Sequence, residues 1–523
     1  PGAPARPTPR GPHGRRPPAS PTPPLHSGVV ERTDSGVVER TRLAPGLEIA
    51  RVLTGLWQVA DMERDGRTLD PEASAAAMER YVAAGLTTFD MADHYGSAEL
   101  IAGHYRATRE AEGTGLPKTQ MLTKWVPPPG KVTAEQVRAA VDLARRRLRT
   151  ERIDLLQFHT WTYDDPAWLD ALFHLTDLQD EGLIGAIGLT NFDAVHLHMA
   201  LASGVPVVSN QVSFSLIDRR ATNGLTDLCV STGVKLLAYG TLAGGLLTER
   251  WLGREEPDWD DARTTWSLNK YRRFVEAAGG WDAYQDLLRV LHDVARRHGV
   301  SVANVASRAI LDTPGVGGVI IGARLGESEH IDDTLRLFEL RLSDHDVTEL
   351  AAATERLGPI PGDCGDEYRR PPYLTASGDL SHHLSEMPRP YPVTRDDGGR
   401  RRVGTGTVWE DLAGYARAVR EGGRVLVSGT TALHGDRLIG GDDPAAQAHF
   451  VIDKIAGALR SLGASLEDVV RTRVYVTDPA HVEAVARAHG QRFAEVRPAN
   501  TLVIAGLVGE GQLVEIEAEA VVG

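Results

Sequence analysis

Residues 89–96 read Phe89-Asp90-Met91-Ala92-Asp93-His94-Tyr95-Gly96, a short apolar run that ends in a polar loop. Such a run, followed by an amphipathic helix, is typical of one β/α unit. Eight runs of this kind occur between residues 47 and 357, at 52–57, 87–91, 121–125, 153–159, 184–189, 207–212, 234–239 and 316–321. Because most of them are followed by a helix signal, the count predicts an α/β fold, a (β/α)8 TIM barrel.

In a barrel of this kind, residues at the carboxyl end of each strand face the active site. Residues with useful chemistry stand at these ends: Asp90, Lys124, His159, Thr190, Asn191, Gln211, Tyr239, Gly322 and Arg324. A random scatter would not place such residues at the end of run after run. The sequence therefore predicts one site at this face of the barrel.

Four of the side chains suit proton donation. Tyr95 would carry the proton, and Lys124 would lower the pKa of Tyr95 by placing a positive charge beside the phenolate. Asp90 would hold Lys124, and His159 would polarise or orient the group that receives the proton. This chemistry fits the reduction of a carbonyl or a C=N bond. Each residue alone also fits an ordinary structural role, but their shared register favours the functional one.

Composition excludes several classes of partner. The net charge of -14 argues against a nucleic-acid or anionic-membrane partner. The only cysteines, Cys229 and Cys364, provide neither a disulfide framework nor a thiolate metal site. No stretch approaches the roughly 18 apolar residues of a membrane span. We expect a cytoplasmic protein with a small-molecule substrate and no metal.

The chain is too long for one core and divides into three zones. Residues 1–42 form a Pro- and Arg-rich tail that we expect to be disordered. Residues 43–385 hold the barrel. Residues 386–523 predict a smaller α+β domain, with strands at 424–427, 471–476, 501–505 and 513–522 and helices at 444–462 and 479–493.

A long stretch, 248–280, interrupts the barrel pattern after the seventh run. It is rich in charge and in tryptophan, namely Trp251, Trp259 and Trp266. Long loops at the active face of a barrel usually shape the substrate pocket or fold over a cofactor. The alternative is a surface excursion held by buried tryptophan anchors.

Motifs spread over residues 43–385 resemble those of the aldo-keto reductase family. They are Asp90-x-Ala92-x-x-Tyr95-Gly96, Thr123-Lys124, Asp154-Leu155-Leu156-x-x-His159, Gly188-Leu189-Thr190-Asn191-Phe192, Asn210-Gln211, Tyr239-Gly240-x-Leu242-Ala243-Gly244-Gly245 and Ile321-Gly322-Ala323-Arg324. Each motif is weak alone, whereas their order and spacing together are specific. The resemblance implies a barrel that binds NADPH in extended form, with Tyr95 as the general acid.

The same resemblance implies the contacts of the nicotinamide. Thr190, Asn191 and Gln211 would bind its carboxamide, and Tyr239 would stack on its ring. The backbone from Leu242 to Gly244 would wrap the pyrophosphate, because glycine permits close approach.

At the adenosine end, Gly322 and Arg324 would meet the 2′-phosphate. A guanidinium there favours NADP over NAD through charge-assisted hydrogen bonds. A helix expected over 327–337 would direct its N-terminus at the same phosphate. Family members often carry Asn near the middle of this helix, where this chain has Asp333-Thr334.

Residues 403–523 resemble the Rid (YjgF) family of reactive-intermediate deaminases. The resembling stretches are Gly414-Tyr415-Ala416-Arg417-Ala418-Val419, Val427-Ser428-Gly429-Thr430-Thr431, Gly463-Ala464-Ser465-x-Glu467-Asp468, Arg497-Pro498-Ala499 and Val514-Glu515-Ile516-Glu517-Ala518. The resemblance implies a trimer with ligand clefts between subunits, in which Tyr415 and Glu515 would line the cleft. Asn500 stands where deaminase members carry the arginine that binds a substrate carboxylate, and asparagine has no charged fork.

The leading hypothesis is an NADPH-dependent reductase of a carbonyl or imine. Its Rid-like module would assemble the enzyme as a homo-oligomer, a trimer or a multiple of three, or would handle an imine or enamine. Two alternatives stay open: a non-catalytic nucleotide-sensing scaffold, and a bifunctional reductase plus imine/enamine deaminase.

Overall fold

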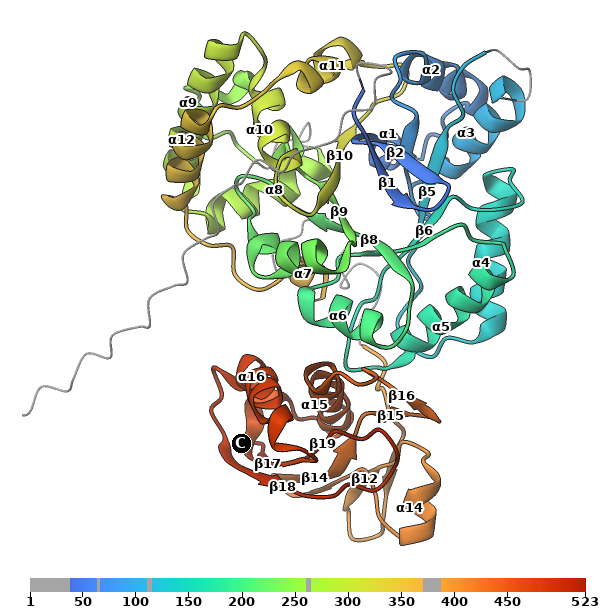
Figure 1. The fold of residues 1–523 in the computed structure, drawn as a ribbon, viewed down its shortest axis with the longest axis vertical. Coiled ribbons are helices and arrows are strands. Elements are labelled where there is room, and N and C mark those ends of the chain that lie inside the picture. The colour runs from blue at the N-terminus through green and yellow to red at the C-terminus, as the bar shows by residue number, and fades with distance from the viewer. Residues whose placement is uncertain (1–37, 64–65, 111–114, 260–264, 370–386) are drawn as a thin grey trace, which may run out of the picture.

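The computed structural model describes residues 38–63, 66–110, 115–259, 265–369 and 387–523. Its larger part is a closed barrel of parallel strands in the order β10-β3-β4-β5-β6-β7-β8-β9 (Figure 1). The strands are β3 (Val52–Gly55), β4 (Thr88–Asp90), β5 (Gln120–Trp125), β6 (Leu155–Phe158), β7 (Ile187–Thr190), β8 (Val207–Ser213), β9 (Lys235–Tyr239) and β10 (Val316–Gly322). Each overlaps one predicted run, so the predicted (β/α)8 barrel is confirmed.

Helices cover the outside of the barrel. They are α1 (Trp57–Met62), α2 (Pro71–Ala83), α3 (Ala98–Tyr105), α4 (Ala134–Arg147), α5 (Ala167–Asp180), α6 (Ala194–Ala202), α7 (Leu225–Thr232), α9 (Gly280–His298), α10 (Val302–Leu311), α11 (Ile331–Glu339) and α12 (Asp344–Glu355). Local signals fix several starts. Asp70 caps α2 ahead of Pro71, and Thr133 and Gln136 form a capping box at α4. None of the described helices is long and apolar enough to cross a membrane.

A hairpin of β1 (Arg40–Ala44) and β2 (Leu47–Ala50) closes the amino end of the barrel. Leu47 and Ile49 pack there against the inward-facing Leu53, Leu122 and Leu155. This plug leaves the carboxyl end for the site. The hairpin begins inside the predicted 1–42 tail, and residues 1–37 lie outside the described residues.

The 248–280 stretch contains a helix, α8 (Trp266–Ala277), after the short turns η3 (Ala243–Gly245) and η4 (Glu249–Trp251). Thr265 caps α8 through its side chain, and Gly279 ends it in the left-handed region. A further short helix, α13 (Asp366–Arg369), returns to the carboxyl end of the barrel. Both helices bring residues that are distant in sequence to the site.

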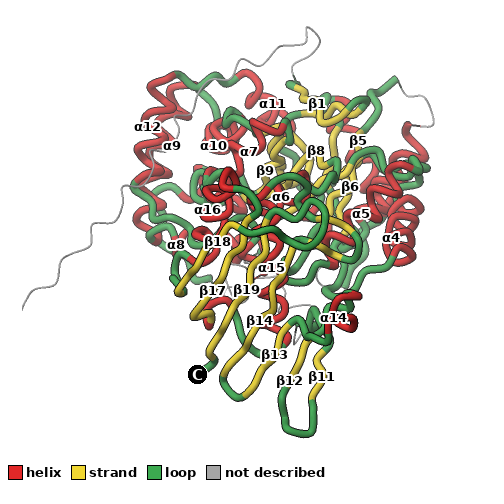
Figure 2. The backbone as a smooth tube through the Cα atoms, turned by 60° about the horizontal axis from the view of Figure 1, so that its bottom comes forward, coloured by secondary structure: helices red, strands yellow, loops and turns green. Residues whose placement is uncertain are grey.

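The C-terminal part is a seven-stranded sheet in the order β11-β12-β13-β14-β19-β17-β18. Its elements are β11 (Val393–Arg395), β12 (Arg401–Val403), α14 (Val408–Ala413), β13 (Ala418–Glu421), β14 (Arg424–Thr431), α15 (Pro444–Ser461), β17 (Val469–Val476), α16 (Val482–Phe493), β18 (Ala499–Ile504) and β19 (Val514–Val521), with a separate hairpin of β15 (Leu433–His434) and β16 (Arg437–Leu438). Helices α15 and α16 lie between this sheet and the barrel, and no helix of the described residues covers the opposite, bare face of the sheet (Figure 2). The α+β prediction is confirmed, although β11 to β13 were not predicted.

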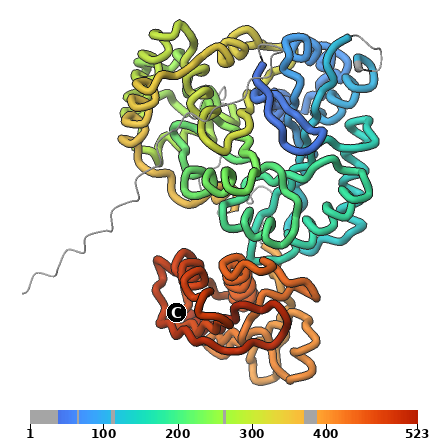
Figure 3. The backbone as a smooth tube through the Cα atoms, in the orientation of Figure 1, coloured from blue at the N-terminus to red at the C-terminus, as the bar shows by residue number. Residues whose placement is uncertain are grey.

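The two parts meet where α15 lies against α6 (Figure 3). Three histidine–aspartate pairs cross this contact: His196–Asp453 at 3.1 Å, His198–Asp443 at 2.8 Å and His434–Asp170 at 2.8 Å. Arg460 adds a two-pronged contact to Asp164. The contact is therefore polar, and three histidines each lie beside a carboxylate of the other part.

Candidate active site

Asp90 and Lys124 form the buried base of the site. Asp90 ends β4, and Lys124 lies near the end of the adjacent β5. The two residues are 3% and 4% exposed. Lys124 Nζ donates to Asp90 Oδ2 at 2.7 Å and to the Met91 carbonyl at 2.9 Å. The structure therefore brings the two residues into direct contact.

Asp90 is satisfied by amides as well as by the ammonium. Gln157 Nε2 donates to Asp90 Oδ1 at 3.0 Å, and Gln211 Nε2 donates to the same oxygen at 2.7 Å. Gln157 was not predicted, although it stands next to the end of β6. Three donors on one carboxylate fix its position in a buried place.

Tyr95 lies above this base and is half-buried. Lys124 Nζ is 4.9 Å from the centre of the Tyr95 ring, and Trp57 and His94 pack edge-on against the ring. We expected Lys124 to lower the pKa of Tyr95. Burial and the carboxylate of Asp90 instead raise that pKa well above its usual value, because Lys124 is already committed to Asp90. The proton therefore stays on Tyr95 at neutral pH.

His159 is buried and neutral. Burial lowers the pKa of His159 to about 3, and Arg369 adds to this effect. Its Nδ1 lies 3.3 Å from the Thr190 carbonyl, which assigns the hydrogen to Nδ1. Nε2 is buried with no hydrogen-bond partner among the described residues. A lone pair at Nε2 is thus available to orient a substrate group that carries a hydrogen.

The residues predicted for the carboxamide lie together at the ends of β7 and β8. Asn191 has a left-handed backbone (φ 61°), held by hydrogen bonds to Gln211 and from Arg369. The Tyr239 hydroxyl donates to Asn191 Oδ1 at 2.8 Å, and Thr190 Oγ1 donates to the Gln211 carbonyl at 3.1 Å. The side-chain nitrogen of Asn191, Nδ2, has no hydrogen bond to a described residue, so it is available to a carboxamide.

Next to Tyr239 the chain makes a tight left-handed turn. Ala243, Gly244 and Gly245 have φ values of 46°, 67° and 94°. A Cβ on Gly244 would come within 2.9 Å of Ser267 and Tyr271 of α8. Glycine is required there. The amides of Ala243 and Gly245 already donate to the Gly240 and Leu242 carbonyls, so an anion such as a pyrophosphate would have to use the remaining amides of the turn, which begins at Leu242.

Arg324 follows Gly322 at the exposed rim of the site. Its guanidinium pairs with Asp61 at 3.1 Å and with Glu327 at 2.9 Å. The helix predicted over 327–337 begins later, at Ile331, and its first turn carries Asp332 and Asp333. That helix end is therefore less favourable to a phosphate than expected.

Residues of α8 and α13 at the site were missed by the sequence analysis. Glu367 is fully buried, pairs with Arg220 at 2.8 Å and lies 3.3 Å from the Tyr239 hydroxyl. Tyr368 lies 3.3 Å from the same hydroxyl and accepts a hydrogen bond from Lys270 at 2.6 Å. Leu268, Tyr271 and Phe274 of α8 are apolar residues at helical spacing, which could have indicated the helix but not its position.

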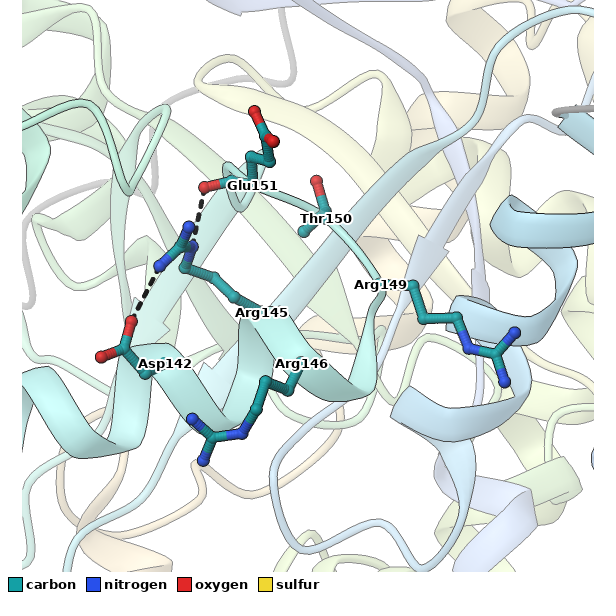
Figure 4. Close-up of a pocket in the computed structure, with 6 residues that line it drawn as sticks. All are labelled: Asp142, Arg145, Arg146, Arg149, Thr150 and Glu151. Carbon is teal, nitrogen blue, oxygen red and sulfur yellow. Dashed lines mark hydrogen bonds and ion pairs between the residues drawn. The ribbon is translucent and has the colours of Figure 1, made fainter.

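A surface depression of about 410 Å³ at the end of α4 is unrelated to this site (Figure 4). Arg145 is bound there by Asp142 and the Glu151 carbonyl, while the side chains of Arg146 and Arg149 diverge from it. The arginines do not converge on a common ligand position.

In the C-terminal part, two of the three predicted cleft residues lie around Arg417, which was not predicted. Arg417 donates to the Tyr415 hydroxyl at 3.2 Å, and its charge acts on Glu515. Burial raises the pKa of Glu515. Asn500 lies on β18, two strands from β19, where it donates to Thr472. Within one chain, Asn500 therefore lies apart from Tyr415 and Glu515.

Family comparisons agree with both regions. Residues 51–355, more than half of the chain, match the Aldo/keto reductase family. The chain belongs to that family. Residues 408–522 match the model described as Endoribonuclease L-PSP, which is the Rid (YjgF) family of the sequence analysis. The chain is thus a nicotinamide-dependent oxidoreductase of the aldo/keto reductase family, and a Rid-family domain follows the barrel in the sequence.

Individual relatives match one region each. An uncharacterized protein of Streptomyces coelicolor is 44% identical over 121 residues, which are 23% of this chain and 90% of that protein. Aldo-keto reductase YhdN of Bacillus subtilis is 26% identical over 349 residues, 64% of this chain and 98% of that protein. The structure of a glycerol dehydrogenase from Gluconobacter oxydans is similar in fold, with 24% identity and a TM-score of 0.50. The match covers 62% of this chain and 97% of the dehydrogenase.

Proposed function

We propose that this protein is an NADPH-dependent reductase of aldehydes, ketones or imines, in which Tyr95 is the general acid. The observation that carries the proposal is the buried Asp90–Lys124 pair at 2.7 Å beneath the Tyr95 ring. His159, with its unpartnered Nε2, faces the same region.

NADPH, when bound, supplies the hydride, and the chain supplies the proton and the orientation. Thr190, Asn191 and Gln211 would hold the carboxamide, with Tyr239 against the ring. Tyr95 keeps its proton until charge develops on the substrate oxygen or nitrogen, and Lys124 stabilises the resulting phenolate. The buried carboxylate of Asp90 fixes Lys124 throughout.

We assign NADPH rather than NADH to Arg324. Its partner Glu327 is half-exposed, and an exposed ion pair of this kind contributes only about 0–1 kcal/mol. A dianionic 2′-phosphate would displace that glutamate and gain a bidentate contact. The acids Asp61 and Asp332 reduce the preference but leave its direction unchanged.

The Rid-family domain is proposed to assemble the enzyme as a trimer through the bare face of its sheet. Leu426, Val503 and Val521 lie on this face, and each is more than 40% exposed. Because α15 is covered by the barrel, the sheet face is the one left for a second copy. Mass measurement of the full chain would give three chains per particle; a monomer would contradict this assignment.

The reductase proposal is tested by following NADPH oxidation with a panel of aldehydes, ketones and cyclic imines. Turnover that disappears in Tyr95→Phe while the variant still binds NADPH supports it. Turnover that survives this change removes Tyr95 from the role of acid. Nucleotide binding without turnover of any substrate would favour the sensing scaffold.

A further inference from the structure

Lys270, on α8, places an ammonium inside the protein at the carboxyl end of the barrel. The residue is 9% exposed. Its Nζ donates to the Tyr368 hydroxyl at 2.6 Å. Four aromatic rings surround it, with ring centres at 4.6 Å (Tyr368), 4.9 Å (Tyr239), 5.3 Å (Tyr271) and 6.0 Å (Phe274).

This ammonium has no carboxylate partner within 4.0 Å among the described residues. The nearest acid that acts on it, Glu367, is engaged by Arg220 at 2.8 Å. Aromatic faces stabilise a cation but accept none of its hydrogen bonds, so at least one of its three donors lacks an acceptor. Burial alone would lower the pKa of Lys270, but Tyr368, Tyr271 and Glu367 raise it, and the group is charged at neutral pH.

The Lys270–Tyr368 pair borders the proposed catalytic residues. The Tyr368 ring centre is 5.8 Å from that of His159, whose Nε2 is unpartnered. Tyr368 also raises the pKa of Tyr95 through space. A group bound by Lys270 would therefore be part of the molecule that receives the proton of Tyr95.

We propose that Lys270, positioned by Tyr368, binds a carboxylate on the carbonyl substrate, so that the enzyme selects acidic aldehydes or ketones. A buried ammonium is stable when it is paired and hydrogen-bonded, and a carboxylate completes both conditions. This inference rests on the proposed reductase function and names its substrate class.

The test compares 2-, 3- and 4-formylbenzoate with their methyl esters, because the three isomers sample three separations between carbonyl and charge. Wild type should prefer at least one acid to its ester. In Lys270→Met the acid-to-ester ratio of kcat/KM should fall about 100-fold, the usual size of a lost buried charge partner. Lys270→Arg should keep most of the preference. Lys118→Met, in an exposed loop before β5, is the matched control and should keep the wild-type ratio.

A binding measurement gives a second readout that does not depend on turnover or on the stability of one variant. Benzoate should inhibit wild type more strongly than benzamide, and Lys270→Met should remove that difference. Equal use of acids and esters by wild type, or an unchanged ratio in Lys270→Met, would overturn the proposal. So would weaker NADPH binding as the only effect, since the anion would then be a cofactor phosphate. Reduction of any of these acids or esters by wild type checks the reductase function separately; if none is reduced, both proposals fail.

Discussion

The barrel site and the C-terminal cleft contain the same kinds of side chain in different states of completion. The barrel has a phenol, a cation and a carboxylate in Tyr95, Lys124 and Asp90, and the carboxylate accepts three hydrogen bonds. The cleft has Tyr415, Arg417 and Glu515, but the side-chain carboxylate of Glu515 accepts no hydrogen bond from a described residue. Arg417 turns instead to the Gly429 carbonyl and Thr430.

The difference shows that residue types alone do not make a site. Catalytic groups act when their positions are fixed before the reaction. The barrel fixes its groups within one chain, because adjacent parallel strands end at the same face. The cleft leaves its carboxylate unbound and Asn500 two strands away, so a second copy would have to complete it.

The largest effect is expected from removing the acid of the complete site. Tyr95→Phe should lower kcat for carbonyl reduction by about 1,000- to 10,000-fold, the upper range for general acid catalysis. The Kd of NADPH should change little, because the hydroxyl lies above the Asp90–Lys124 base. Steady-state rates and fluorescence titration measure the two effects.

The same substitution in the other region, Tyr415→Phe, is the matched control. It should leave carbonyl reduction by the barrel unchanged, since the phenol belongs to a separate domain. If Tyr415→Phe lost as much carbonyl reduction as Tyr95→Phe, the two sites would act as one, and the distinction between a complete and an incomplete site would be wrong.

Asp90→Asn and Glu515→Gln test how complete each site is. Asp90→Asn removes the charge partner of a buried ammonium and should lower the free energy of unfolding by about 3–5 kcal/mol. Glu515→Gln should cost less than about 0.5 kcal/mol, as for a substitution away from buried networks. Urea unfolding followed by tryptophan fluorescence measures both. Similar losses would show that Glu515 is as firmly held as Asp90.

Much of the barrel site was predictable because its signals are local. Asp90, Lys124, His159 and Gln211 each follow an apolar run, and parallel strands bring such ends together. Lys270 and Tyr368 were not predictable, because the sequence around them does not indicate which strand ends α8 and α13 will contact. In the C-terminal part, β11 to β13 are short and alternate weakly between buried and exposed residues, so their pattern predicts no strand.

The contact between the two regions should depend on pH through His196, which stacks on Tyr163 and bridges Asp193 and Asp453. Burial alone would lower the pKa of His196, but the two carboxylates raise it. Its stabilisation is therefore complete below the unfolded value of about 6.5 and is lost as pH rises through the folded value. The pKa of Asp193 is lowered to about 2, so its own contribution is lost only in strong acid.

Thermal unfolding between about pH 6 and pH 9 checks this. Wild type should lose about 1–3 kcal/mol over this range, the size of a hydrogen bond to a charged group. His196→Gln removes this titration, so its stability should fall less with pH than that of wild type. The dependence that remains belongs to His198, whose pKa the hydrogen bond to Asp443 also raises. A wild type whose stability falls no more than that of His196→Gln would show that a charged His196 does not join the two regions.

The smallest effect is expected at the exposed rim of the barrel site, where Arg324 is held by ion pairs to Asp61 and to the exposed Glu327. Arg324→Ala should raise the Kd of NADPH by about tenfold and leave that of NADH within about twofold, because only NADPH carries the 2′-phosphate. Glu327→Gln frees the guanidinium from one competitor and should tighten NADPH binding slightly. If both nucleotides respond alike to Arg324→Ala, the arginine supports the fold rather than the phosphate, and the rim is no more specific for its ligand than the incomplete cleft.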